Sequence, residues 1–143
     1  MNTESLNGAA YRYICPKVNY VMIQTIKILV VEDNLLTLKI YNFILKKEGY
    51  AVYNAVNGMD AIELINEIQP DLLITDVILP LKSGLEVTSY CKNNFPHIPI
   101  IVISGLGEEE GTVTKAFNLG ADDFVAKPFN PNELLLRVSR LLI

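Results

Sequence analysis

Short, almost continuously apolar segments alternate with helical patterns along most of this chain. The apolar segments cover residues 26–31, 50–54, 72–76, 98–103 and 124–126. After the first of them, apolar residues recur at helical spacing and end near Gly49. They predict one apolar helix face made of Leu36, Ile40, Phe43 and Ile44.

Four more helical patterns separate or follow the remaining segments. The second helix is expected to end near Pro70 and the third near Asn93, and three glutamates at 108–110 suit the first turn of a fourth helix that ends at Gly120. Leucine and valine at helical spacing over residues 134–142 predict the last helix. Apolar strands alternating with helices are typical of a parallel sheet covered on both faces. We therefore predict a single doubly wound α/β domain with five parallel strands and five helices.

Residues 1–25 do not share this alternation. Residues 1–10 are mostly polar, and residues 11–20 contain aromatic side chains without a sustained period. We interpret residues 1–25 as an N-terminal extension that is flexible or a non-native start, with Met22 as an alternative first residue. Residues 26–143 are expected to form the domain.

Composition narrows the class of protein. The 143 residues suit one domain, 50% of them are hydrophobic, and the net charge is −4. An acidic domain without a cluster of Lys and Arg is not expected to bind nucleic acid directly. Apolar runs are far shorter than the roughly 18 residues of a membrane span. Cys15 and Cys91 lack metal-type spacing, so we expect free thiols in a soluble, cytoplasmic protein without membrane contact.

Polar residues collect directly after four of the predicted strands. Glu32 and Asp33 follow the first strand, Asp76 ends the third, Ser104 follows the fourth and Lys127 follows the fifth. In an open parallel sheet these positions share the carboxyl edge, where ligands bind. The sequence therefore predicts one polar site built from distant segments.

The charges of this set indicate a divalent cation and phosphoryl chemistry. Three carboxylates and one ammonium group leave a negative excess, and oxygen ligands without His or Cys favour Mg²⁺, with Mn²⁺ as the alternative. A carboxylate can attack phosphorus to form an aspartyl phosphate. Asp76 is the natural nucleophile, Asp33 and Glu32 are better placed to hold the metal, and Lys127 and Ser104 can contact phosphoryl oxygens.

Three segments resemble a known family. Lys27–Asn34, Asp71–Pro80 and Gly120–Phe129 are similar to the acidic first strand, the phospho-acceptor segment and the lysine-containing last strand of response-regulator receiver domains. The resemblance runs from about residue 26 to the C-terminus, with the motifs in the expected order and spacing. It implies the flavodoxin-like, chemotaxis-regulator-like strand order 2-1-3-4-5.

The resemblance also implies roles for individual residues. Asp76 would be the phosphorylation site and Asp33 a direct Mg²⁺ ligand, together with the backbone carbonyl of Ile78. Glu32 would be the outer acidic residue, standing where Asp is commoner. Among the remaining positions, the resemblance makes Lys127 the phosphate-binding lysine and makes Ser104 and Phe124 the switch residues.

Partners follow from the same resemblance. A sensor histidine kinase or phosphotransfer protein of a two-component phosphorelay would supply the phosphoryl group, and a downstream effector domain or protein would respond. Asp123 and Arg137 resemble a charge pair that transcription-factor receivers use across a dimer, whereas Val113 and Asn118 stand near where the matching charges would be. We therefore expect at most a weak homodimer, enhanced by phosphorylation.

Rival functions remain open at this point. Phosphatases of the haloacid-dehalogenase type also use an aspartate nucleophile with Mg²⁺, but they need a second aspartate two residues later, where this chain has Ile78. A pseudo-receiver that only docks proteins would not need Asp33, Asp76 or Lys127. The preferred hypothesis is a signalling switch, not an enzyme, whose chemistry is limited to its own phosphorylation and autodephosphorylation.

Overall fold

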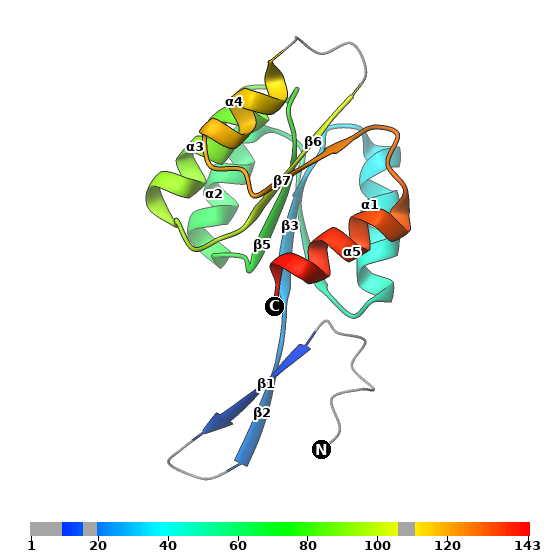
Figure 1. The fold of residues 1–143 in the computed structure, drawn as a ribbon, viewed down its shortest axis with the longest axis vertical. Coiled ribbons are helices and arrows are strands. Elements are labelled where there is room, and N and C mark those ends of the chain that lie inside the picture. The colour runs from blue at the N-terminus through cyan, green and yellow to red at the C-terminus, as the bar shows by residue number, and fades with distance from the viewer. Residues whose placement is uncertain (1–9, 16–19, 106–110) are drawn as a thin grey trace.

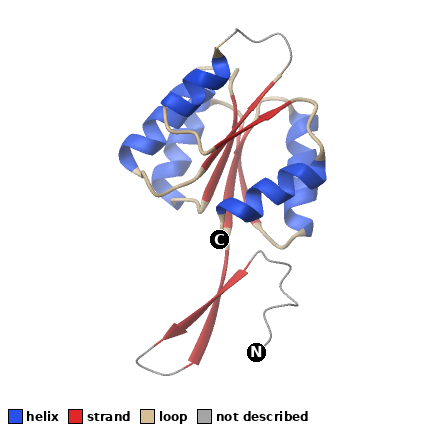
Figure 2. Ribbon diagram, in the orientation of Figure 1, coloured by secondary structure: helices blue, strands red, loops and turns tan. Residues whose placement is uncertain are grey.

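An open parallel sheet with helices on both faces forms the main body of the protein in the computed structural model (Figures 1 and 2). The structure describes residues 10–15, 20–105 and 111–143. Neighbouring strands are parallel and lie in the order β4-β3-β5-β6-β7. This is the predicted order 2-1-3-4-5, and the doubly wound fold is confirmed. The strands are β3 (Lys27–Val31), β4 (Ala51–Ala55), β5 (Leu72–Asp76), β6 (Ile100–Ser104) and β7 (Asp123–Ala126).

Helices divide between the two faces of the sheet. Figure 1 shows α1 and α5 on one face and α2, α3 and α4 on the other. Each face has its own buried cluster, with Leu38 and Leu134 in the first and Ile65 and Val87 in the second. The interior strands β5 and β6 are buried along their whole length because helices cover both of their sides. The helices are α1 (Leu35–Lys47), α2 (Gly58–Ile68), α3 (Gly84–Asn94), α4 (Thr112–Asn118) and α5 (Pro131–Leu141).

Polar caps start four of these helices just after the strand ends. The side chains of Asn34, Asn57 and Asn130 accept hydrogen bonds from backbone N–H groups in the first turns of α1, α2 and α5. Ser83 forms a complete capping box with Glu86 at the start of α3. Each cap stabilises its helix by about 1 kcal/mol. The caps fix where each chain segment turns away from the carboxyl edge of the sheet.

The buried face of α1 differs from the predicted one. Leu38, Tyr41 and Leu45 are buried, whereas Leu36 is 71% exposed and Phe43 is 69% exposed. The prediction was wrong for Leu36, Ile40 and Phe43, whereas Ile44 packs partly buried against the core. Helix α1 carries apolar residues around most of its circumference, so spacing alone gives two overlapping stripes. An apolar stripe of α1 is consequently left in solvent.

The start of β6 also differs from the sequence-based expectation. Strand β6 begins at Ile100 instead of residue 98, because Pro99 has no N–H to donate to a sheet ladder. Among the described residues, α4 begins at Thr112 after Gly111, which has a φ of 90°. The predicted first turn at residues 108–110 lies outside the described part of the chain.

An antiparallel hairpin precedes the sheet. Strand β1 (Ala10–Cys15) pairs with β2 (Tyr20–Thr25) in a separate two-stranded sheet. One residue, Ile26, separates β2 from β3, and the hairpin extends away from the body in Figure 1. These strands were not predicted from the sequence, because their residues lack strict alternation of polar and apolar side chains.

None of the helices within the described residues is long and apolar enough to cross a bilayer.

Gly84 is placed where the first turn of α3 touches the end of β5. A Cβ atom at this position would collide with the backbone carbonyl oxygen of Asp76. The Gly84 N–H also donates a 2.7 Å hydrogen bond to the Val77 carbonyl. The absence of a side chain at residue 84 therefore lets α3 approach the strand that carries Asp76.

We expect Gly84→Ala to lower the free energy of unfolding by about 1–3 kcal/mol, since the methyl group must displace backbone. Urea denaturation measures the change. Gly105→Ala is the matched control, because a Cβ there meets nothing within 4 Å and should leave stability unchanged or raise it by up to about 1 kcal/mol. Equal effects of the two substitutions would contradict the close approach of α3 to the end of β5.

Candidate functional site

Four strand ends bring the predicted polar residues together. The ladder continues one residue beyond β3, β5 and β7, as Glu32 N–H donates to Ala55, Val77 N–H to Ile103 and Lys127 N–H to Ser104. These bonds are 3.0, 3.1 and 2.7 Å long. Backbone pairing thus holds the strand ends at one edge of the sheet, as the sequence predicted.

Lys127 is at the centre of the site. Its ammonium nitrogen lies 2.7 Å from Glu32 Oε1 and 2.8 Å from Asp76 Oδ2. Burial alone would lower the pKa of Lys127, but the hydrogen bonds to Asp76 and Glu32 outweigh it and raise the pKa above the ordinary lysine value. The lysine is therefore charged at neutral pH and joins two carboxylates that come from different strands.

Glu32 is the most deeply buried acid of the site, with 1% of its surface exposed. Oε1 accepts from Lys127, whereas Oε2 is buried without a hydrogen-bond partner among the described residues. Burial raises the pKa of Glu32, Lys127 lowers it, and Asp76 raises it further, with a net upward shift. An orphaned buried carboxylate oxygen costs free energy unless a further positive charge or donor satisfies it.

The three acids form one cluster of oxygen ligands. Carboxylate oxygens of Glu32, Asp33 and Asp76 all lie within 4.8 Å of one another. Oxygen-only donors suit a hard cation such as Mg²⁺, and the unpartnered Glu32 oxygen marks where positive charge is missing. The residues present therefore fit the metal that the sequence predicted.

Asn34, not Asp33, caps α1. The Asn34 side chain accepts a 3.0 Å hydrogen bond from the Thr37 N–H, which makes Asn34 the N-cap of the helix. Asp33 is an exposed residue. Because Asp33 does not cap the helix, its carboxylate lies in the acidic cluster with Glu32 and Asp76.

Asp76 ends the central strand β5 and retains limited access to solvent. It is 9% exposed, and its Oδ1 accepts a 2.8 Å hydrogen bond from the Val77 N–H. Oδ2 accepts from Lys127. Hydrogen bonds to both oxygens thus fix the orientation of the Asp76 carboxylate. Ile78 lies two residues farther on in the loop after β5.

The other predicted residues occupy neighbouring positions. Ser104 is 6% exposed at the end of β6, where it is paired in register with Ala126. Phe124 on β7 is half-buried and packs against the cluster beneath α2, α3 and α4. Ser104 and Phe124 therefore lie on adjacent strands that lead to the acidic site.

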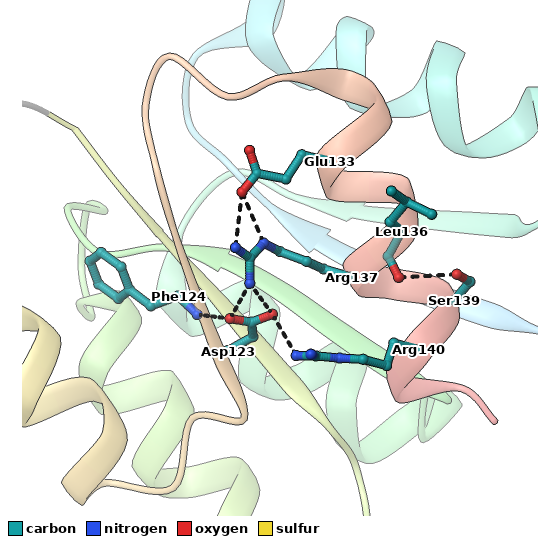
Figure 3. A network of polar contacts seen from close by, with 7 residues as sticks. All are labelled: Asp123, Phe124, Glu133, Leu136, Arg137, Ser139 and Arg140. Carbon is teal, nitrogen blue, oxygen red and sulfur yellow. Dashed lines mark hydrogen bonds and ion pairs between the residues drawn. The ribbon is translucent and has the colours of Figure 1, made fainter.

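A separate ion-pair network joins β7 to α5 through Asp123, the residue before Phe124 (Figure 3). Arg137 donates 2.9 Å hydrogen bonds to both oxygens of Asp123 and binds Glu133 as well. Asp123 Oδ1 also accepts from the Phe124 N–H at 2.8 Å. The charge pair suspected of bridging two molecules is thus satisfied within this one.

Sequence reasoning missed one aromatic pair beneath the site. Tyr41 of α1 is 2% exposed and stacks on Phe129, with ring centroids 5.0 Å apart and planes at 9°. The helical spacing of Tyr41 from Leu38 and Leu45 could have indicated that Tyr41 is buried. The exposed apolar residues of α1 have a similar spacing, so the pattern did not distinguish the two faces. The sequence indicated Phe129 only as part of the Lys127-Pro128-Phe129 motif and gave no partner for its ring.

Family comparison gives a match over most of the chain. The model of the response regulator receiver domain matches residues 28–139. These residues include the whole five-stranded sheet from Ile28 onward and every residue of the candidate site.

Solved structures agree with this match. The receiver domain of NtrX from Brucella abortus is 34% identical, with a TM-score of 0.75 over 80% of this chain and 97% of that chain. In a longer NtrX structure solved with ADP, the similarity covers only 26% of that chain. The receiver domain of a signal transduction histidine kinase from Syntrophus aciditrophicus is 32% identical, with a TM-score of 0.75 over 81% and 89% of the two chains. The chain belongs to the response regulator receiver domain family.

Proposed function

We propose that this protein is a phosphorylatable receiver that takes a phosphoryl group onto Asp76 in a Mg²⁺-dependent reaction and changes its output surface in response. The observation that carries the proposal is the Lys127 ammonium group, which bridges Glu32 and Asp76 beside a third carboxylate, Asp33. A sensor histidine kinase or a phosphotransfer protein is the proposed donor. An effector domain or protein is the proposed recipient of the signal.

Phosphoryl transfer to Asp76 needs few covalent steps. A carboxylate oxygen of Asp76 forms the new P–O bond while the P–N bond of a donor phosphohistidine breaks, and the imidazole leaves with the electron pair of that bond. Lys127 already lies at hydrogen-bond distance from Asp76 Oδ2 and is placed to neutralise an oxygen of the arriving group. The Ser104 hydroxyl is the proposed donor to another oxygen.

Metal binding is assigned to the acidic cluster. Asp33, Asp76 and the Ile78 carbonyl would hold Mg²⁺ directly, and Glu32 would act as the outer acidic residue. The ion supplies positive charge to the phosphoryl oxygens when it is bound. The ligand types agree with this assignment, because all of them are hard oxygens.

The site argues against a pure docking module. Such a module would have no use for three clustered carboxylates and a partly buried lysine, since groups of this kind cost free energy to desolvate. Here Glu32 and Asp76 are both buried at the strand ends. This costly arrangement favours phosphoryl chemistry over docking alone.

Incubation with acetyl phosphate and Mg²⁺ should add one phosphoryl group at Asp76, visible as an increase in intact mass. Asp76→Asn should abolish the increase because the amide is a poor nucleophile, and EDTA should suppress it. Asp71→Asn is a matched control, since Asp71 binds the Lys27 N–H at the start of the same strand. Labelling of Asp76→Asn at the wild-type rate would refute the proposal, and no labelling of any protein would favour the pseudo-receiver.

Substitutions of the two acids after β3, Glu32 and Asp33, should weaken Mg²⁺ binding to different extents. Asp33→Asn should weaken Mg²⁺ binding more than Glu32→Gln, because a direct ligand contributes more than an outer one. Outer residues still change metal-site function by about 10–100-fold, so the order of the two effects is what isothermal titration calorimetry tests. A larger loss in Glu32→Gln would exchange the proposed roles.

Switching is proposed to pass from Ser104 to Phe124. Movement of the Ser104 hydroxyl toward a phosphoryl oxygen would vacate space beside β6, and the half-buried Phe124 on β7 could rotate into it. The phosphoryl group favours one state only through its different affinity for the two. Asp123 holds the backbone N–H of Phe124, so this motion is expected to be confined to the side chain.

Self-association through the surface of α4, β7 and α5 should be weak. Arg137 and Asp123 already bind each other within one molecule, and a dimer contact would compete with that pair. Sedimentation velocity with and without beryllofluoride, a stable mimic of the phosphoryl group, should show a monomer that associates slightly more with the mimic. A tight dimer in both states would contradict the switch in association, and a strict monomer in both would assign the output to another protein.

A further inference from the structure

The aromatic stack between Tyr41 and Phe129 joins the first helix to the chain segment that carries Lys127. Tyr41 is almost completely buried in the cluster beneath α1 and α5. Phe129 is only partly buried and packs against that cluster from outside. The near-parallel rings at 5.0 Å are in direct contact.

Phe129 lies in the middle of a short connection between two fixed points. At one end, the Lys127 N–H donates to the Ser104 carbonyl. At the other end, Asn130 caps α5 by accepting a 2.9 Å hydrogen bond from the Asn132 N–H. Between these points the stack on Tyr41 holds the connection against α1.

The other side of this connection is open. A groove of about 530 Å³ is lined on α1 by Thr37 and Ile40 and on the connection by Pro128, Phe129 and Pro131, together with Lys127. Phe129 therefore has an open groove beside it, and the buried Tyr41 ring supplies its aromatic contact. Loss of that ring would let Phe129 and the neighbouring backbone move into the groove.

The position of the Lys127 ammonium group depends on that backbone. Lysine has a flexible four-carbon side chain, yet its nitrogen is held at 2.7 and 2.8 Å from two carboxylates. In phosphoryl transfer, rate enhancement comes mostly from positioning and charge. A misplacement of about 1 Å can cost on the order of 100-fold in rate.

We propose that Tyr41 is a positioning residue for phosphorylation of Asp76, acting through its stack on Phe129 to hold Lys127 over the carboxylates. The proposal rests on the phosphoryl chemistry proposed above. It concerns the ring of Tyr41 and not its hydroxyl group. Burial, followed by the negative charges of Glu32 and Asp76, raises the pKa of Tyr41, so the hydroxyl adds no charge to the site.

The test compares removal of the ring with a matched removal elsewhere in the same core. Tyr41→Leu and Phe129→Leu should each slow labelling by acetyl phosphate at saturating Mg²⁺ by about 10-fold or more. Tyr41→Phe keeps the stack and should label at the wild-type rate. Tyr50→Leu is the control, because Tyr50 belongs to the same buried cluster. It should label within about twofold of wild type.

A double-mutant cycle separates positioning from loss of stability. In a Lys127→Ala background, Tyr41→Leu should change the labelling rate by less than about twofold, since the group that Tyr41 positions is gone. An equal loss with and without Lys127, or an equal loss in Tyr50→Leu, would overturn the proposal. Phe129→Leu carries the same comparison if Tyr41→Leu does not fold.

Nuclear magnetic resonance of the Lys127 ammonium group gives a readout that does not need phosphorylation. Its signal, assigned by its loss in Lys127→Ala, should exchange with solvent faster in Tyr41→Leu than in wild type, Tyr41→Phe or Tyr50→Leu. Unchanged exchange in Tyr41→Leu would overturn the role of Tyr41. If the wild-type protein is not labelled at all, the proposed phosphorylation fails, and the exchange measurement still decides whether Tyr41 positions Lys127.

Discussion

The ion pairs of Lys127 with Glu32 and Asp76 are the interaction on which the rest of the site depends. Two carboxylates with 1% and 9% exposure would repel each other at the end of an apolar sheet without a cation between them. Lys127 can lie there only because β7 is placed beside β6 by parallel pairing and its N–H binds the Ser104 carbonyl. Strand order, ladder register and buried charge are thus parts of one arrangement.

The sequence predicted this arrangement well because strand ends are marked by a sharp change from apolar to charged residues. Glu32, Asp76 and Lys127 each follow an apolar run, and a parallel sheet leaves only one edge where they can meet. The strand order, by contrast, came only from the family resemblance, because alternation of strands and helices is compatible with several orders.

Other features could not be obtained from the pattern. The buried face of α1 was misassigned because Leu36 and Leu38 belong to different stripes of a helix that is apolar on both. The stack of Tyr41 on Phe129 joins residues far apart in sequence, and nothing local indicates that their rings meet. The β1–β2 hairpin depends on backbone pairing between two irregular segments. Each of these is settled by three-dimensional packing and not by periodicity.

The cap of α1 shows that the order of two neighbouring residues, and not the composition, defines the acidic site. Asn34 satisfies the helix end with a neutral amide, so Asp33 remains in the carboxylate cluster. A chain with these two residues exchanged would have the same net charge, and its helix would still start with a good capping residue. The aspartate of that chain, however, would accept hydrogen bonds from the backbone of α1, close to the partial positive charge of the helix end. Searches for such sites by residue content alone would therefore accept sequences in which the ligand has become a cap.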